Sequence, residues 1–332
     1  MLKFLGLRFV RYSIMTFAVT SLAYLMAVNF FNPAVQMMDV TGGAEVDPEV
    51  SYERVQQSLA QLDLDPDQNM FQRYWVWLTA IITDWDWGRT PTGGYVNNEF
   101  GIRVWISAQL TLVATVLTFI IGVALGVYAA ARQYKFGDRF ATWYSYLTMV
   151  LPTPVAYLLV QRTAIWINEQ AGERIFFVTG YRSVGVEGTW NQFVDMAAHY
   201  AVPTVAITIF GWAAMQISQR QYLLDFVNAD FVRTARATGL TRKQAIRRHA
   251  LRVSFVPTAQ SLAFTIPALL TGTIFAEVIF NWDGLGLWSI RALHGHDVNS
   301  TVVMTFYACI IFAIGALLAD FFTSIVDPRV RL

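Results

Sequence analysis

Cysteine and charge are both scarce in this chain, and their scarcity excludes several classes of protein. The sequence holds one cysteine, Cys309, so no disulfide can form within the chain. It also holds no G-x-x-x-x-G-K-[ST] loop, no H-E-x-x-H pair and no G-x-S-x-G turn. These motifs carry phosphate binding, zinc-dependent hydrolysis and serine hydrolysis. We therefore expect no catalytic residue and no ATP site in this chain.

Long uncharged runs are abundant instead. Hydrophobic residues make up 55% of the sequence and charged residues 14%. A helix that crosses a bilayer needs about 20 mostly apolar residues, and the sequence has six such runs without Lys, Arg, Asp or Glu. They predict an all-α membrane protein with six transmembrane helices. The runs are Ser13–Phe31, Val104–Ala131, Phe140–Gln161, Tyr200–Gln219, Val253–Ala276 and Thr301–Ala319.

Charge alternates between the connections. Residues 32–103 hold eleven acidic residues against four arginines, whereas residues 230–257 hold seven Lys or Arg against one Asp. Because Lys and Arg are enriched in cytoplasmic loops, the pattern predicts a cell-membrane protein with both termini and the 230–257 segment in the cytoplasm. We expect three parts: residues 1–31 with the first helix, an external loop over 32–103, and a five-helix core over 104–332 with a cytoplasmic loop at about 223–252.

The basic segment 230–257 carries the signals of two helices with a break between them. Apolar spacing predicts a helix over Asp225–Thr238, and Gly239 supplies the left-handed residue that commonly ends a helix. Thr241 and Gln244 form a T-x-x-Q capping box, which predicts a second helix from about Arg242 up to the fifth span.

Two explanations fit this basic loop. Attraction to anionic membrane lipid, together with the setting of topology, accounts for the charge. The small residues Ala235 and Ala237 beside the glycine turn favour close docking of a short helix into another protein. Composition alone does not choose between them.

The fifth apolar run is the most polar of the six, and it also contains Pro267 and Gly272. Polar groups in hydrocarbon need neighbours or water. Hydrogen bonds between helices are one explanation, and a helix that lines a polar path is the other. The inner end of the fourth run, with Gln216, is a second candidate wall of such a path. The side chains that we predict to line a translocation path are Gln216, Gln260, Thr265, Thr271 and Glu277.

Proline and glycine predict two local features of the apolar helices. Pro152 and Pro154 lie inside the third run and remove backbone donors, so they should kink or interrupt its helix. Gly122 and Gly126 lie four residues apart in the second run, which permits a close approach of another helix.

His294, His296 and Asp297 are grouped near the start of the sixth run. Two histidines and one carboxylate could bind a metal, but an ordinary solvated loop explains them as well, and we expect no metal site.

The segment "DFVRTARATGL…RRHALR…VP" resembles the cytoplasmic loop of permease subunits from ABC importers of the dipeptide, oligopeptide and nickel group. Four other segments match in the same order: "LKFLGLRFVRYSI", "WGRT", "VIFNWDGLGLWSIRAL" and "DPRVRL". The chain is similar to the six-span partner with a long external loop after its first helix. The resemblance covers most of the chain and implies the type I importer permease fold.

The resemblance implies that the helix ending at Gly239 is a coupling helix, which sits in a cleft of a cytoplasmic ATPase. The importer pattern E-A-A-x-x-x-G falls on Arg233, Thr234, Ala235 and Gly239, with Arg and Thr in place of Glu and the first Ala. The implied coupling residues are Arg233, Thr234, Ala235, Arg236, Ala237, Thr238 and Gly239.

The same resemblance implies the partners and the absence of a cofactor in this chain. A second permease, two ATPase subunits that use ATP and Mg²⁺, and an external substrate-binding protein would complete the importer within membrane lipid, and no nucleic acid is involved. Peptides are the expected cargo, with nickel or oligosaccharides as the alternative. A secondary transporter is disfavoured because the centres of the runs lack carboxylates, and an intramembrane enzyme because they lack paired catalytic groups.

Overall fold

The structure is a computed structural model, and the part of the chain that it describes is helical. No strand occurs in that part beyond a single bridge between Arg89 and Tyr95, so the all-α prediction is confirmed. The described residues are 2–32, 57, 59, 68–272 and 274–326, and the described side chains are those of 6–32, 57, 59, 68–261 and 274–319.

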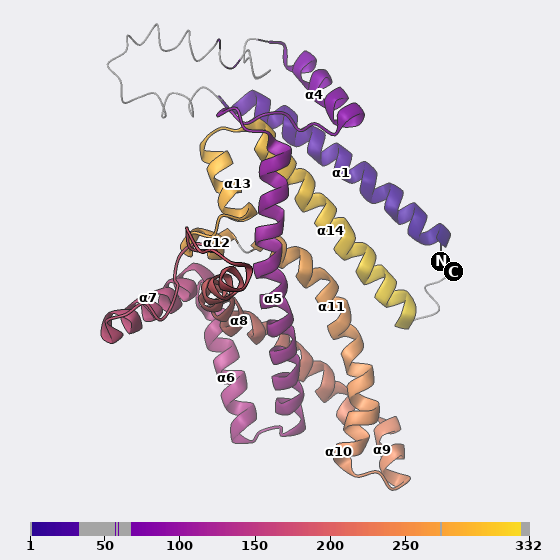
Figure 1. Ribbon diagram of the computed structural model, residues 1–332. Coiled ribbons are helices and arrows are strands. Elements are labelled where there is room, and N and C mark those ends of the chain that lie inside the picture. Colours follow the sequence, from indigo (N-terminus) through magenta and orange to yellow (C-terminus); the bar gives the residue numbers. More distant parts are fainter. Residues whose placement is uncertain (1, 33–56, 58, 60–67, 273, 327–332) are drawn as a thin grey trace. The chain divides into compact units, whose positions relative to one another are not determined.

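Figure 1 labels the helices in chain order. The long helices are α1, α5, α8, α11 and α14, and the shorter ones lie between them. Their bounds are α1 (Leu2–Phe30), α4 (Met70–Asp84), α5 (Val96–Ala131), α6 (Phe136–Val150), α7 (Thr153–Ala171), α8 (Thr189–Val227), α9 (Asp230–Ala237), α10 (Arg242–Ala245), the π-helix η1 (Ile246–Ala250), α11 (Leu251–Gly272), α12 (Ile274–Ile279), α13 (Leu285–His294) and α14 (Val298–Val326).

Four helices of the described residues are long and apolar enough to cross a membrane. Helices α6 and α7 make a fifth span if this bent pair is counted as one. The predicted run Val253–Ala276 includes residues whose side chains lie outside the described ones, so the count of six stays a prediction. The four spans are Gly6–Phe30, Val96–Ala131, Thr189–Val227 and Val298–Ala319.

The third apolar run is broken where the prolines predict it. Helix α6 ends at Val150, α7 begins at Thr153, and the two axes bend by 107°. Leu151 adopts an extended conformation, with ψ of 127°, because the ring of Pro152 disfavours the helical region for the residue before it. The predicted interruption is confirmed, and the run is therefore not one straight helix.

The chain forms two compact units that do not follow its order. One unit comprises Leu2–Ser107 with Asp283–Ala313, and we call it the outer unit after the predicted external loop that belongs to it. The other comprises Ala108–Trp282 with the chain from Ile314, and we call it the coupling unit after the predicted coupling helix. Helix α5 contributes to both. The division of the sequence at residues 31 and 103 remains a prediction about topology, since compactness groups the residues differently.

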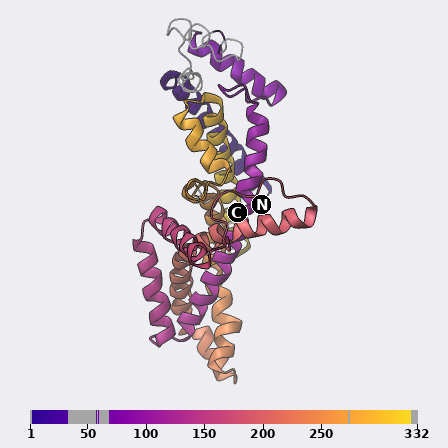
Figure 2. The ribbon, with the colours of Figure 1, turned by 60° about the vertical axis from the view of Figure 1, so that its left-hand side comes forward.

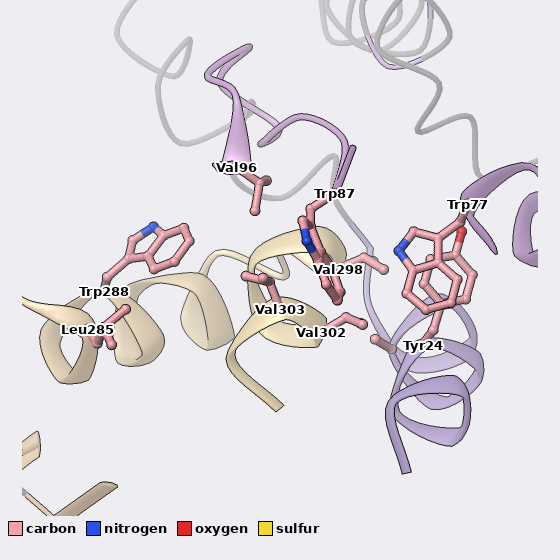
Figure 3. Close-up of a cluster of buried hydrophobic side chains, with 10 residues drawn as sticks. Tyr24, Trp77, Trp87, Val96, Leu285, Trp288, Val298, Val302 and Val303 are labelled. Carbon is pink, nitrogen blue, oxygen red and sulfur yellow. The ribbon is translucent and has the colours of Figure 1, made fainter. Parts of the chain in front are cut away.

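The outer unit has an aromatic core (Figure 3). Tyr24 of α1 stacks on Trp77 of α4, with ring centroids 4.4 Å apart. Trp87 packs against Phe306 of α14 at 4.7 Å. Large rings therefore fill the space between α1, α4 and α14, and valines of α14 complete the cluster with Leu285 and Trp288 of α13.

In the coupling unit, α5 and α8 approach each other through glycines. A Cβ added at Gly122 would lie 2.7 Å from Cβ of Met215, and one at Gly126 would lie 2.8 Å from the carbonyl oxygen of Gln216. Such distances leave no room for a side chain. The close packing predicted for the two glycines is confirmed, and their neighbour is a helix of the same chain.

Candidate functional site

The loop between α8 and α11 has the helix–turn–helix form that the sequence predicts. Helix α9 ends at Ala237, and Gly239 follows in the left-handed region with φ of 97°. At Thr241 both hydrogen bonds of the capping box are present, and α10 begins at Arg242. The first boundary differs, because α8 continues to Val227 and α9 starts only at Asp230.

The second helix of the loop is not separate from the fifth span. Helix α10 continues through η1 into α11 without a break, and the π-helical turn Ile246–Ala250 lies at the junction. Within this turn Ile246 and Ala250 are buried, while Arg247, Arg248 and His249 are exposed. Such π turns are often found at functional sites, and no signal in the sequence predicts this one.

One face of α9 packs onto its own chain. Val232 and Ala235, which lie three residues apart, are 1% and 8% exposed. They belong to a cluster of small and branched residues from α5, α8, α10 and η1, namely Ala130, Leu223, Val227, Ala245, Ile246 and Ala250. The methyl group of Ala235 therefore helps to anchor α9 on its own chain, and the coupling role of residues 233–239 stays a prediction.

The opposite face of α9 is exposed. It presents Arg233, Thr234, Arg236, Ala237 and Thr238, followed by Gly239. An ion pair between Arg233 and Asp230, at 3.6 Å, is exposed on both sides and adds little stability. A short helix that is anchored on one side and open on the other can dock into another protein.

Phe231 also belongs to this open face, although it is not among the coupling residues that the resemblance implies. Its side chain is 41% exposed, and its ring lies 6.4 Å from that of Phe226. The sequence signal for Phe231 is a large aromatic residue in a short basic helix, next to the residues Val232 and Ala235 that the helix buries. An exposed aromatic ring is a common anchor of protein interfaces.

Two buried glutamines of α8 make hydrogen bonds to other helices of the coupling unit. Gln216 is fully buried, and the hydroxyl of Ser145 on α6 donates to its Oε1 at 2.8 Å. Gln219 donates to Oγ of Ser254 at 3.3 Å and accepts from the hydroxyl of Thr258, both on α11. Buried amides need such partners, and hydrogen bonding between helices accounts for Gln219 and for Oε1 of Gln216. Nε2 of Gln216 is buried and has no hydrogen-bond partner among the described residues.

The predicted path residues lie on three different helices where the structure describes them. Gln216 is on α8, Gln260 on α11 is partly buried, and Glu277 on α12 is fully buried. Thr265 and Thr271 lie outside the residues whose side chains are described. The predicted role of these residues in a translocation path therefore stays a prediction.

The predicted solvated loop at the start of α14 is an ordered part of the outer unit. Asp297 is 3% exposed and accepts from the backbone N–H of Ser300 at 3.0 Å and from its hydroxyl at 2.6 Å. Burial raises the pKa of Asp297 to about 6. His296 accepts from the backbone N–H of Asn32 at 3.1 Å. Asp297 therefore caps α14, and the expectation of an ordinary solvated loop is wrong for this residue.

Residues 122–332 match the family model described as "Binding-protein-dependent transport system inner membrane component". The chain belongs to this family. It is thus a multi-pass membrane component of a transport system that includes a binding protein. The family description assigns a transport role, in line with the expectation that the chain is not an enzyme by itself.

The chain also aligns with relatives that are named as transport permeases, and the alignments cover most of both chains. The chain is 31% identical to the oligopeptide transport system permease protein OppB of Mycobacterium tuberculosis (strain H37Rv) over 100% of both chains. It is 28% identical to the dipeptide transport system permease protein DppB of Escherichia coli K12, covering 85% of this chain and 86% of that one. The resemblance to permeases of the dipeptide and oligopeptide group is confirmed.

A solved structure of the MetNI methionine ABC transporter, in an inward-facing conformation, aligns with a TM-score of 0.45 and 16% sequence identity. The alignment covers 70% of this chain and 94% of the transporter chain.

Proposed function

We propose that this chain is the membrane permease subunit of an ATP-driven peptide importer, in which α9 transmits force from cytoplasmic ATPase subunits to the membrane helices. The observation that carries the proposal is the two-sided environment of α9. Val232 and Ala235 anchor the helix to α5, α8 and η1, while Arg233, Arg236 and Ala237 lie open on the other side. A partner that moves the open face would move the anchored helices with it.

Peptides are the cargo class that the relatives support. OppB and DppB are named as oligopeptide and dipeptide transport permeases. Nickel or oligosaccharides are the alternative cargo, since an external binding protein selects the substrate in such an importer.

Two basic segments support the proposed orientation. The α5–α6 turn carries Arg132, Lys135 and Arg139, and the 242–252 segment carries five further cations. Both segments lie at the same end of the coupling unit (Figures 1 and 2). We assign this end of the coupling unit to the cytoplasm, because Lys and Arg are enriched in cytoplasmic loops. We assign both termini of this cell-membrane protein to the same side, because Lys3, Arg8 and Arg11 precede the first apolar run and Arg329 and Arg331 follow the last one.

The proposed assembly contains a second permease, as a heterodimer with this chain, two ATPase subunits that bind ATP and Mg²⁺, and a binding protein outside. The translocation path would lie against Gln216, Gln260, Thr265, Thr271 and Glu277. Gln216 would have to leave Ser145 to meet a solute, since it is fully buried in this conformation.

The test is co-purification of the ATPase subunits with variants of the open face of α9. Ala237→Glu places a carboxylate on that face without touching the buried contacts, and Phe231→Ala removes its aromatic ring. We expect both variants to fold, and Ala237→Glu to lose the ATPase and the uptake of peptide. A matched control is Val184→Glu, which changes a fully exposed residue of the α7–α8 connection.

Normal ATPase binding and uptake in Ala237→Glu would overturn the coupling role of α9. The cargo is tested separately, by uptake of labelled peptides, nickel chelates and oligosaccharides into proteoliposomes that contain the whole importer with its binding protein. Uptake of nickel or sugar without peptide would overturn the peptide assignment and leave the coupling role intact.

A further inference from the structure

Helix α8 is joined to α6 by three side chains on one of its faces. They lie four residues apart, so they stack along the helix. The aromatic contact joins Trp212 and Tyr144, whose rings are stacked with centroids 5.1 Å apart. The polar contacts join Gln216 to Ser145 and Arg220 to Asp138.

The contact between Asp138 and Arg220 lies nearest to the α5–α6 turn, and it consists of two parallel hydrogen bonds. Nε of Arg220 donates to Oδ1 of Asp138 at 2.6 Å, and Nη2 donates to Oδ2 at 3.0 Å. The Asp138 side chain is 3% exposed and that of Arg220 19%. Two parallel hydrogen bonds from one guanidinium fix the distance and the orientation of both side chains.

The same carboxylate also shapes the turn between α5 and α6. The backbone N–H of Tyr134 donates to Oδ2 of Asp138 at 2.8 Å. Tyr134 has φ of 65°, a conformation that non-glycine residues adopt only when their surroundings hold them there. The ring of Tyr128 lies against Gly137, where an added Cβ would be 2.7 Å from the phenol oxygen. Asp138 thus ties a tightly built turn to α8.

Along α8, Arg220 lies close to the coupling loop, by which we mean the connection from α8 to α11 that contains α9, α10 and η1. Seven residues separate it from Val227 at the end of the helix, which corresponds to about 10 Å at 1.5 Å per residue. Leu223 and Val227 belong to the cluster that holds Val232 and Ala235 of α9. A displacement of α9 therefore reaches Arg220 through less than two further turns of α8.

We propose that the Asp138–Arg220 ion pair is a positioning clamp that makes α6 and the α5–α6 turn follow α8 when the coupling loop moves. This proposal rests on the proposed function. A buried ion pair adds little net stability compared with an apolar contact of the same size, but its forked geometry defines how two helices are aligned. Without the clamp, α8 would move with α9 while α6 lagged behind, and ATP would be hydrolysed with less transport.

The test uses the whole importer in proteoliposomes and measures peptide taken up per ATP hydrolysed. Asp138→Asn keeps the size of the side chain and removes its charge, and Arg220→Lys keeps the charge and removes the fork. We expect both variants to assemble with the ATPase subunits. Changes along a coupling network are worth about 0.5–2 kcal/mol, so the uptake per ATP should fall about two- to thirtyfold.

A second measurement separates positioning from a general loss of structure. Spin labels at Phe140 on α6 and Asp225 on α8, in a Cys309→Ala background, report the separation of the two helices. In the parent chain this distance should stay constant through the ATP cycle, and in Asp138→Asn it should change when ATP is added. The control is Arg291→Gln, which breaks an exposed ion pair with Asp283 at 3.1 Å and should change neither readout.

Unchanged uptake per ATP in both variants, or a helix separation that already changes in the parent chain, would overturn the clamp. If Asp138→Asn fails to assemble, Arg220→Lys decides the question, because it keeps both charges in place. Failure of the proposed function looks different, since the parent chain itself would then bind no ATPase.

Discussion

The outer unit and the surroundings of α9 in the coupling unit hold their helices together by different means. Large rings fill the outer unit, where Tyr24 and Trp77 stack at 4.4 Å and Trp87 lies between α4 and α14. Around α9 and between α5 and α8, the coupling unit instead uses residues with little or no side chain, such as Gly126, Ala235 and Ala245. Elsewhere the coupling unit also buries rings, among them Phe280 and Trp282. Large rings stabilise through the area that they bury, whereas small residues bring backbones close and leave no slack between helices.

The close packing of small residues around α9 has a functional consequence. Packing without slack transmits displacement, because a neighbour cannot absorb it by a side-chain rearrangement. The coupling loop is built in this way, and it is the part of the chain that we propose to receive force. The aromatic cluster, in contrast, suits a unit that has to stay assembled.

Trp87→Ala should give the largest loss of stability, because the ring is 2% exposed. Truncation of a buried tryptophan costs about 3–5 kcal/mol. Thermal unfolding in detergent measures the change. Trp75→Ala, at a ring that is 64% exposed, is the matched control and should change little. Equal losses in the two variants would contradict the importance of the aromatic core.

Gly126→Ala should come next, because its new methyl group would meet the carbonyl oxygen of Gln216 at 2.8 Å. Overpacking of this kind costs about 1–3 kcal/mol. Gly101→Ala in the same helix has no heavy atom within 4 Å of its added Cβ and should be neutral or slightly stabilising. A tolerated methyl group at Gly126, seen as an unchanged unfolding temperature and unchanged peptide uptake, would remove the argument for packing without slack.

Asp297 predicts a pH dependence of stability in the outer unit. Its pKa is raised from 3.8 to about 6 in the folded chain, because the carboxyl group is buried. The folded state binds the proton more tightly than the unfolded state, so stability should fall as the pH rises from about 4 to 6 and level off above. Asp297→Asn should flatten the unfolding temperature over this range. An equally steep dependence in the variant would assign it to another group.

Thr241→Ala should give the smallest effect, by removing the side-chain half of the capping box at α10. Loss of such a cap costs about 1 kcal/mol. The measurement is hydrogen exchange of the α10 amides, which should become faster, with Thr83→Ala at an exposed position as the control. Unchanged protection would mean that η1 and α11 hold the start of α10 without its cap.

Much of the coupling loop could be read from its residues, because caps and breaks are local. Gly239, Thr241 and Gln244 act on their own neighbours, and the turn and the second helix start lie where they predict. The orientation of α9 could not be read in this way. Whether Ala235 or Ala237 is buried depends on where Ala130 and Ile246 lie, and these residues come from other helices.

The partners of the buried polar residues also could not be read from the sequence. Gln216 was predicted to line a path because a buried glutamine in an apolar helix is costly without a partner. The partner is Ser145, which is 71 residues away in the sequence. The ion pair between Asp138 and Arg220 joins residues 82 apart, and nothing in the residues next to either one marks it as half of a pair.

Residue order was enough to establish a helical membrane chain, its broken third run, the cap signals of the loop between α8 and α11 and the family resemblance. Each of these depends on contiguous residues: runs of apolar side chains, prolines, glycines and short motifs. The folded chain decided which face of α9 is open, which glycines touch α8, and which charges hold α6 in place. Those features depend on distances between residues far apart in the sequence, and only packing brings such residues together.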